Sequence, residues 1–435
     1  MATTYLSRTG STGNRKTLTI SYWLKRGNIT TSNSQGVLNA GILSDGNNHT
    51  FCGFQSSTDT AIIQTTTSGS NVMSLQSNAL FRDTSAWYHF VWKVDTTQAT
   101  ESDRITLYVN GVEHSLTGTY PSQNQDTWIN YADTHTVGTR FTNYFDGSMA
   151  HVHFIDCTAY DADTFGETDA TTGIWKPKTA PSVTYGTNGF FLKFENSGAF
   201  GTDSSGNANT FTVNGTMTQN IDTPSNVFAT LNALTGVGGD SGNKQVLSQG
   251  NLTVTGNQAS WCHSRGTLGY STGKWYWEAK VTGTISDMNI GVSNTGTNLT
   301  FGTAQSQAGN TTIYTDGSKN INGTITSGVF TAYSLGDIIG IAHNADANTV
   351  TFYKNGSAIL SDQPVSGGSD TTWTPASAVY NTTGFFSFNF GNGYFGTTAV
   401  SSAQNPDDGI GIFEHNVPAG YYALCTKSIN AQEYD

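Results

Sequence analysis

The amino-acid sequence predicts an all-β protein built from two antiparallel β-sandwiches in tandem. The first observation is a repeated hairpin, since Ile105–Glu113 and Val350–Ala358 each run from β-branched and aromatic residues into Asn-Gly. Asn-Gly favours the type I′ turn, because both central residues of that turn need positive φ. The second is composition: charged residues make up 11%, and 49 of the 435 residues are glycine, which favours sheets joined by polar loops. The third is length, which suffices for two sandwiches and their connections.

The first domain is expected over residues 1–195. Thr17–Leu24 alternates as a half-buried strand does, with Leu18, Ile20 and Tyr22 on one side. Further strands are expected at Trp87–Val94, Ile105–Val109, Phe145–Ile155 and Phe190–Phe194. The best candidate for a helix is a short turn at Asp161–Phe165, with Asp161 as its cap.

The second domain is expected over residues 241–400, after a connector at 196–240 that is rich in turn residues. Asp337–Ala342 and the second Asn-Gly hairpin repeat the three-strand meander that Trp87–Val94 begins in the first domain. Phe386, Phe388 and Phe390 recur at period two and are expected to share one face. A tail at 401–435 ends with another strand-like segment, Gly420–Lys427.

Composition also excludes several classes of function. The formal net charge is −12 with only 19 Lys and Arg and no basic cluster, so nucleic-acid binding is not expected. No apolar run approaches the length of a membrane span, and the N-terminus lacks the apolar core of a signal peptide, which predicts synthesis in the cytoplasm. Four scattered cysteines, Cys52, Cys157, Cys262 and Cys425, are expected to be buried free thiols rather than disulfides or metal ligands.

Catalytic patterns are weak. Glu101/Asp103 and Glu167/Asp169 are spaced as alternate strand residues but lie in polar, loop-like sequence without the third carboxylate of a glycosidase strand. No histidine pairs with a serine or cysteine in a recognisable nucleophile motif, and no phosphate-cradling loop occurs. His151 and His153 could face one side of a strand as zinc ligands, and Asp203 could be a calcium ligand; a structural pair of histidines and a capped turn are the favoured interpretations. No metal and no cofactor is expected.

Binding is more readily placed in loops. The polar segment 120–133 carries Trp128 and Tyr131, and Tyr144 follows shortly after. Aromatic rings flanked by Asn and Asp suit sugar recognition, because a ring stacks on the apolar face of a pyranose while polar groups bond its hydroxyls. The alternative is that Trp128 belongs to the core or covers a sheet edge. In the second domain, Tyr314, Asp316 and Trp373 are comparable ligand-binding candidates.

Both domains resemble known families. The first resembles the laminin-G-like, concanavalin-A-type jelly rolls at Trp87–Val91, Leu107–Gly111, Phe145–Gly147, Phe154–Ile155 and Ala159–Asp161. The second resembles the SPRY domain in the order and spacing of Gly273–Glu278, Ile290–Val292, Gly336–Ile341, Phe352–Gly356, Pro375–Ala376 and Phe388–Gly391. These resemblances imply two concanavalin-A-like jelly rolls in tandem.

Segments around the junction of the two domains indicate the kind of assembly to which the protein belongs. Gly173–Pro177, Tyr185–Phe194, Asp203–Asn207 and Asp222–Val227 are similar to segments in virion proteins of tailed bacteriophages, especially those that infect marine bacteria. The resemblance implies a non-enzymatic virion structural protein at the particle surface: a tail or head fibre, knob or decoration protein. Its implied partners are other virion proteins, further copies of itself and a host surface glycan or protein. A bacterial lectin or adhesin and a glycan-active enzyme remain the alternatives.

Overall fold

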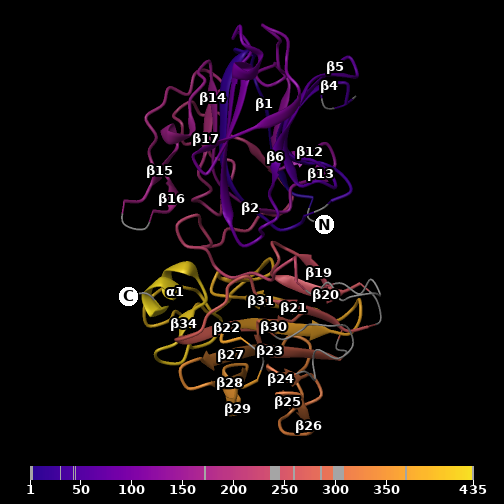
Figure 1. Cartoon of the computed structure of the whole chain (residues 1–435), viewed down its shortest axis with the longest axis vertical. Helices are drawn as coiled ribbons and strands as arrows, with labels where there is room; N and C mark the ends of the chain where they lie inside the picture. Colours follow the sequence, from indigo (N-terminus) through magenta and orange to yellow (C-terminus); the bar gives the residue numbers. More distant parts are fainter. Residues whose placement is uncertain are drawn as a thin grey trace. The chain divides into compact units, whose positions relative to one another are not determined.

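The computed structural model describes residues 3–29, 31–42, 44, 46–170, 173–235, 245–257, 260–284, 287–296, 308–367 and 370–433. The chain divides into two compact units, Met1–Gln219 and Asn220–Asp435 (Figure 1). Each unit consists mainly of two large β-sheets around a hydrophobic core. The predicted all-β fold of two antiparallel sandwiches is therefore confirmed.

The first unit contains an eight-stranded and a six-stranded antiparallel sheet. The larger has the order β10 (Leu116–Thr119), β6 (Ser70–Leu80), β5 (Thr60–Thr67), β4 (Asn48–Phe54), β3 (Gln35–Ile42), β11 (Thr134–Val137), β1 (Tyr5–Thr9) and β18 (Thr212–Asn214). The smaller has the order β17 (Phe190–Leu192), β14 (Gly147–Asp156), β2 (Thr17–Arg26), β7 (Trp87–Asp95), β8 (Ile105–Val109) and β9 (Val112–His114). Two short pairs are β12 (Thr139–Arg140) with β13 (Asn143–Tyr144), and β15 (Gly166–Thr168) with β16 (Trp175–Pro177); the 3₁₀ turns are η1 (Glu101–Arg104) and η2 (Ala162–Thr164).

The second unit repeats this plan. Its first sheet has the order β19 (Gln245–Ser248), β20 (Thr253–Gly256), β31 (Phe386–Asn389), β22 (Lys274–Val281), β27 (Ile338–Asn344), β28 (Thr349–Lys354) and β29 (Ser357–Pro364), and β34 (Tyr422–Ala423) pairs in parallel with β22. Its second sheet has the order β21 (Cys262–Arg265), β30 (Trp373–Val379), β23 (Met288–Asn294), β24 (Asn310–Tyr314), β25 (Lys319–Ile321) and β26 (Thr324–Thr326). A short pair, β32 (Tyr394–Phe395) with β33 (Thr398–Ala399), and the helix α1 (Thr426–Glu433) complete it.

The two cores are formed by the alternation that the sequence shows. Leu18, Ile20 and Tyr22 all point into the first core, and the Trp92 indole N–H donates to the Tyr22 hydroxyl at 3.1 Å. In the second core the three phenylalanines of 386–390 are buried on one face as predicted. Burial of such large apolar side chains is the main source of stability in each sandwich.

The two Asn-Gly hairpins share one detailed device. Asn110 and Asn355 have φ of +50° and the glycines that follow have φ of +80°, which is the type I′ geometry. In the first, the Asn110 N–H donates to the His89 carbonyl at 2.9 Å and its Oδ1 accepts the His89 N–H at 2.8 Å. In the second, Asn355 makes the same two bonds to Ile338, both at 2.8 Å. Each asparagine thus extends the ladder by one residue and fixes the register of its meander.

The segment expected to be a connector instead packs into both units, because it carries apolar residues of its own. Phe211 is buried against Phe190, with ring centres 4.7 Å apart, and β18 pairs with β1. Phe228 and Leu231 are buried in the second unit, as are Phe413 and Leu424 of the expected tail. The division therefore lies at 219/220 rather than in a separate linker.

Two smaller features also bear on the predictions. Asp161 does not cap the 3₁₀ turn η2 with its side chain, because its carboxylate bonds Lys93 Nζ at 2.7 Å and the Tyr108 hydroxyl at 3.1 Å. In the part of the chain that the structure describes, no helix is both long and apolar enough to cross a membrane.

Candidate functional site

The strongest predicted site is a corner of the first unit that we call the Trp128 corner, formed by Arg15, Asp126, Trp128 and Tyr131. The guanidinium carbon of Arg15 lies 5.0 Å from the centre of the Trp128 ring and 5.1 Å from that of Tyr131. The two rings meet edge to face, with centres 4.9 Å apart. The corner is thus a mutually packed group, in which a cation lies against two aromatic faces.

The loop that carries Trp128 is anchored at both the backbone and the side chain. The Trp128 backbone N–H donates to Thr50 Oγ1 at 2.8 Å, and the indole N–H donates to Thr67 Oγ1 at 3.1 Å. Gly41 lies beneath it with φ of +123°, and a Cβ there would approach Trp128 Cβ to 3.0 Å. The ring is therefore held in a fixed position while remaining partly exposed.

Polar groups border the rings. Arg15 donates from Nε to the Thr127 carbonyl at 2.6 Å and forms an ion pair of 3.5 Å with Asp126, whose side chain is 46% exposed. An anchored aromatic face beside an exposed carboxylate and a guanidinium offers both stacking and hydrogen bonds to hydroxyl groups. Trp128 is thus not a core residue. It packs against β3 at Gly41, but its ring also remains partly exposed beside polar groups.

Tyr144 lies apart from this corner. It is on β13, and its ring centre is 6.1 Å from that of Tyr5. Among the described residues, no ring contact joins Tyr144 to Trp128 or Tyr131. The structure therefore brings together two of the three residues predicted in the first unit.

The candidates of the second unit also separate. Trp373 is only 6% exposed and packs edge to face on His343 at 5.8 Å, so it is a core residue and the prediction of an accessible ring fails there. Asp316 is exposed and its Oδ1 accepts the Ser318 N–H at 2.8 Å, which shapes a turn. Tyr314 is partly exposed and meets Trp261 edge to face at 6.4 Å. Trp261 was not among the predicted residues; it directly precedes β21.

The closest approach to a catalytic pair is Ser21 and His89, with Oγ and Nε2 2.8 Å apart in a buried site. The Trp175 indole N–H, which can only donate, points at His89 Nδ1 at 3.0 Å. Nδ1 must therefore be the acceptor. Burial lowers the pKa of His89 to about 3, so the neutral ring carries its proton on Nε2 and donates to Ser21. A histidine in this tautomer cannot take a proton from the serine hydroxyl.

The carboxylate pairs do not converge on a cleft. Glu101 and Asp103 lie in the exposed turn η1. Glu167 and Asp169 both lie within ion-pair distance of Lys176, at 3.6 Å and 2.8 Å. Glycoside hydrolysis needs two carboxyl groups that face each other across the bond to be cleaved, and neither pair has that arrangement.

The metal-site candidates are occupied by protein contacts. His153 Nδ1 lies 2.9 Å from the Tyr185 hydroxyl, and its ring stacks on Phe191 at 3.9 Å. The Asp203 carboxylate accepts from Phe191 N, Ser205 N, Ser205 Oγ and Asn209 N, all within 2.9 Å, which is the capped turn. Within the described ranges no group of three or more His, Cys, Asp or Glu is placed to hold a metal ion.

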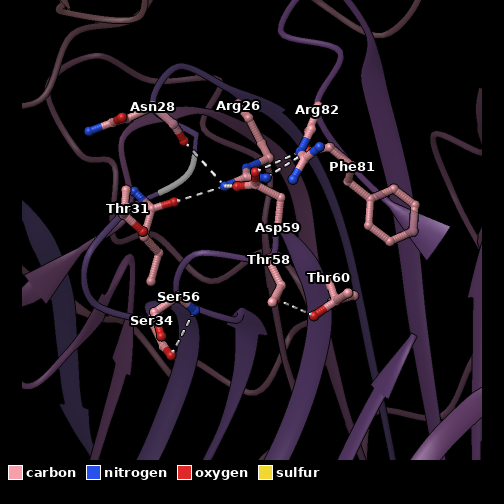
Figure 2. Close-up of polar contacts among 12 residues, drawn as sticks. Arg26, Asn28, Thr31, Ser34, Ser56, Thr58, Asp59, Thr60, Phe81 and Arg82 are labelled. Carbon is pink, nitrogen blue, oxygen red and sulfur yellow. Dashed lines mark hydrogen bonds and ion pairs between the residues drawn. The ribbon is translucent and has the colours of Figure 1, made fainter. Parts of the chain in front are cut away.

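A buried ion-pair cluster was not foreseen (Figure 2). Arg26 and Asp59 are each 1% exposed and 3.0 Å apart, and Arg82 approaches the other Asp59 oxygen at 3.0 Å. Arg26 also donates to the Phe81 carbonyl at 2.6 Å and lies 4.1 Å above the centre of the Phe54 ring. The cluster ties the loops after β2, β4 and β6 to one another, and we assign it a structural role.

Comparison with known proteins identifies both domains. Residues 2–163 match the Concanavalin A-like lectin/glucanases superfamily (Laminin_G_3), and residues 274–392 match the SPRY domain. The predicted laminin-G-like and SPRY domains are therefore both present. No curated protein matches the chain.

Solved structures with similarity include the SPRY domain of human HERC1, at 15% identity and a TM-score of 0.28 over 33% of this chain and 91% of that one. A human SPRY domain has 17% identity and a TM-score of 0.27 over 34% and 96%. A heptameric SAP-like pentraxin from Limulus polyphemus has 14% identity and a TM-score of 0.28 over 37% and 72%. At these values the structural similarities carry no functional argument.

Proposed function

We propose that this chain is a non-enzymatic binding protein that holds a surface glycan at the Trp128 corner. The concanavalin A-like and SPRY domains suggest a binding or adhesin role. The observation that supports the glycan is the anchored, partly exposed Trp128 ring with Arg15, Asp126 and Tyr131 around it. A stacked ring supplies affinity, and the charged neighbours orient the hydroxyl groups.

Glycan binding is tested by titrating the full chain with polysaccharides from host cell surfaces and measuring Kd. Trp128→Ala should weaken binding about tenfold or more, since loss of a stacked aromatic ring costs about 1.4 kcal/mol or more. Tyr144→Ala is the matched control, because it removes a partly exposed ring of the same unit outside the corner, and it should leave Kd unchanged. Equal Kd values for wild type and Trp128→Ala would refute the proposal.

We further propose that the protein is a surface component of a tailed-phage virion, synthesised in the host cytoplasm: a fibre, knob or decoration protein. The support is the resemblance of Gly173–Pro177, Tyr185–Phe194 and Asp222–Val227 to segments of such proteins. Immunogold labelling of purified virions should place the protein on the particle surface. Labelled host cells with unlabelled virions would instead favour a bacterial lectin or adhesin that uses the same corner.

Other virion proteins and further copies of the chain are the proposed partners, since homo-oligomers of closed symmetry are usual for such appendages. Light scattering at micromolar concentration should give the mass of a dimer or trimer. A mass of one chain, 46.4 kDa, would contradict this part of the proposal.

We propose that the chain is not an enzyme, because the two candidate catalytic arrangements are unsuited to catalysis. The carboxylate pairs Glu101/Asp103 and Glu167/Asp169 face no common cleft, and His89 is in the tautomer that donates to Ser21. Incubation with host polysaccharides followed by reducing-end analysis should release no new ends. Cleavage that is lost on replacing one of these acids would establish the glycan-active enzyme instead.

A further inference from the structure

We infer that the segment over the outer face of the six-stranded sheet in the first unit is opened by acid, because histidines beneath it take up protons. We call residues 158–170 and 173–186 the cover; it contains η2, β15 and β16 and lies beside β14 (Figure 1). The inference concerns a conformational change of the first unit and does not depend on the proposed glycan binding.

The cover is held by a small apolar cluster that is separate from the main core of the unit. The sheet contributes Val91 and Ile155, which alternate with core residues and so point outward, and the cover contributes Ala162 and Phe165. The partly buried side chains that pack against them include Tyr160, Trp175, Val183 and Tyr185. Because these contacts lie outside the core, the cover can open while the sandwich stays folded.

Two hydrogen bonds connect the cover to imidazole rings of the sheet. The Trp175 indole N–H donates to His89 Nδ1 at 3.0 Å, and the Tyr185 hydroxyl lies 2.9 Å from His153 Nδ1. An indole N–H can only donate, so the closed cover requires a His89 ring without a proton on Nδ1. A tyrosine hydroxyl can donate or accept, so the second bond tolerates either state of His153. The contact between Trp175 and His89 therefore excludes a protonated ring by geometry.

A third histidine lies beside these two. The ring centre of His151 is 6.3 Å from that of His153, and its Nδ1 is buried without a hydrogen-bond partner among the described residues. Burial lowers the pKa of all three histidines, to about 3 for His89. Each ring is therefore neutral under the closed cover, and its pKa returns to the usual value near 6.5 once opening admits water.

The charges around the three rings give an imidazolium little support. Burial lowers the pKa of His151 and His153, Lys193 lowers it further, and Glu195 opposes the shift at His151. Three carboxylates of the cover are already within ion-pair distance of lysines. The charged and ionisable groups on the surrounding elements are Lys25, Lys93, Tyr108, Tyr160, Asp161, Asp163, Glu167, Asp169, Lys176, Lys178, Tyr185, Lys193 and Glu195.

The direction of the effect follows from proton binding. The closed cover binds fewer protons than the open one, so closure is favoured above about pH 6.5 and is lost progressively as pH falls below that value. For His89 alone, with a pKa of about 3 when closed and about 6.5 when open, the opening constant rises about 25-fold from pH 7 to pH 5. Protonation of His151 and His153 increases this factor.

The test is hydrogen exchange of the full chain at pH 7 and pH 5, corrected for the intrinsic pH dependence of exchange. Peptides of the cover should open about 25-fold or more as often at pH 5 as at pH 7. Peptides of β3 and β4, in the other sheet of the same unit, report global unfolding. At pH 5 the cover should open at least about tenfold more often than these strands, because its opening is local.

His89→Asn separates protonation from packing, because the amide oxygen can accept from Trp175 but takes up no proton. The acceleration between pH 7 and pH 5 should be about 25-fold smaller in this variant than in the wild type. His114→Asn is the matched control: His114 lies in the same sheet, but its ring is near Phe81 of the core, with centres 6.0 Å apart. Its cover should exchange as in the wild type.

Three outcomes would overturn the inference. They are a cover that opens equally often at both pH values, a cover that exchanges at the rate of β3 and β4 at both, and an acceleration that is unchanged in His89→Asn. The first two are read from the wild type, so the test stands even where the variant does not fold.

Discussion

Asp59→Asn is predicted to destabilise the first unit far more than its small change in volume implies. Asparagine has nearly the shape of aspartate and tolerates the left-handed backbone of this position, where φ is +61°. The substitution therefore removes the negative charge next to Arg26 with little other disturbance. Burial lowers the pKa of Arg26, and the negative charge of Asp59 opposes that shift. In the variant, the buried guanidinium loses the carboxylate that stabilises its charged form.

The magnitude follows from burial. Arg26 and Asp59 are each 1% exposed, and removing one partner of a buried ion pair costs about 3 to 5 kcal/mol. Arg26 keeps its bond to the Phe81 carbonyl and its position over the Phe54 ring, and the new amide can still accept a hydrogen bond. We therefore expect a loss of about 3 kcal/mol, at the lower end of that range.

Native-state hydrogen exchange on peptides from β2, β4 and β5 measures this loss in the first unit separately from the second. Arg82→Met is the matched control, because Arg82 binds the same carboxylate but is 43% exposed; it should cost less than about 1 kcal/mol. In the double variant Arg26→Met/Asp59→Asn, most of the stability should return, since no unpaired charge remains buried. A loss below 1 kcal/mol for Asp59→Asn, or one equal to that of Arg82→Met, would refute the reasoning.

Two further predictions concern single side chains. Asn110→Ala and Asn355→Ala should each destabilise their unit by about 1 to 2 kcal/mol in urea unfolding, because the bonded strand N–H loses its acceptor and alanine is strained at positive φ. The controls are Asn110→Asp and Asn355→Asp, which should lose less than half of that stability. Equal losses for the alanine and aspartate variants would contradict the role given to the side-chain acceptor. Burial raises the pKa of Glu278 to about 7, partly offset by the Glu414 and His415 N–H groups that it accepts. Above about pH 4.5 the folded state still holds the proton of Glu278, whereas the unfolded state has released it. The contribution of this carboxyl group to the free energy of unfolding therefore falls by about 3 kcal/mol as pH rises from about 4.5 to 7. The stability difference between wild type and Glu278→Gln should follow that slope, and a difference independent of pH would exclude it.

The fold was predictable because its signals are local. Alternation at Leu18, Ile20 and Tyr22 and at Phe386–Phe390 places each strand's apolar side toward a core, and Asn-Gly fixes the turns of both meanders. The role of 196–240 was not predictable in this way. Phe211 and Phe228 lie in short segments within turn-rich sequence, and only their long-range contacts show that they pack into different hydrophobic clusters.

The same contrast between local signals and long-range contacts applies to the candidate sites. Trp128 and Tyr131 are close in sequence, so their pairing was accessible, whereas Arg15 joins them from more than 100 residues away. Trp373 was expected in a loop, but it begins β30 and its side chain packs into the second core, which only the pairing of distant strands reveals.

The anchored turn asparagines have a consequence for the chemical ageing of the protein. Asn-Gly is the dipeptide most prone to deamidation, which begins when the glycine nitrogen attacks the asparagine side-chain carbon. While Asn110 Oδ1 holds the His89 N–H and Asn355 Oδ1 holds that of Ile338, neither side chain is free to rotate onto the following nitrogen. Succinimide formation therefore requires the hairpin to open, and the extent of deamidation at the two sites records how often each meander has done so. An aspartate product still accepts the strand N–H, whereas isoaspartate adds a backbone carbon and displaces the register that the turn had set.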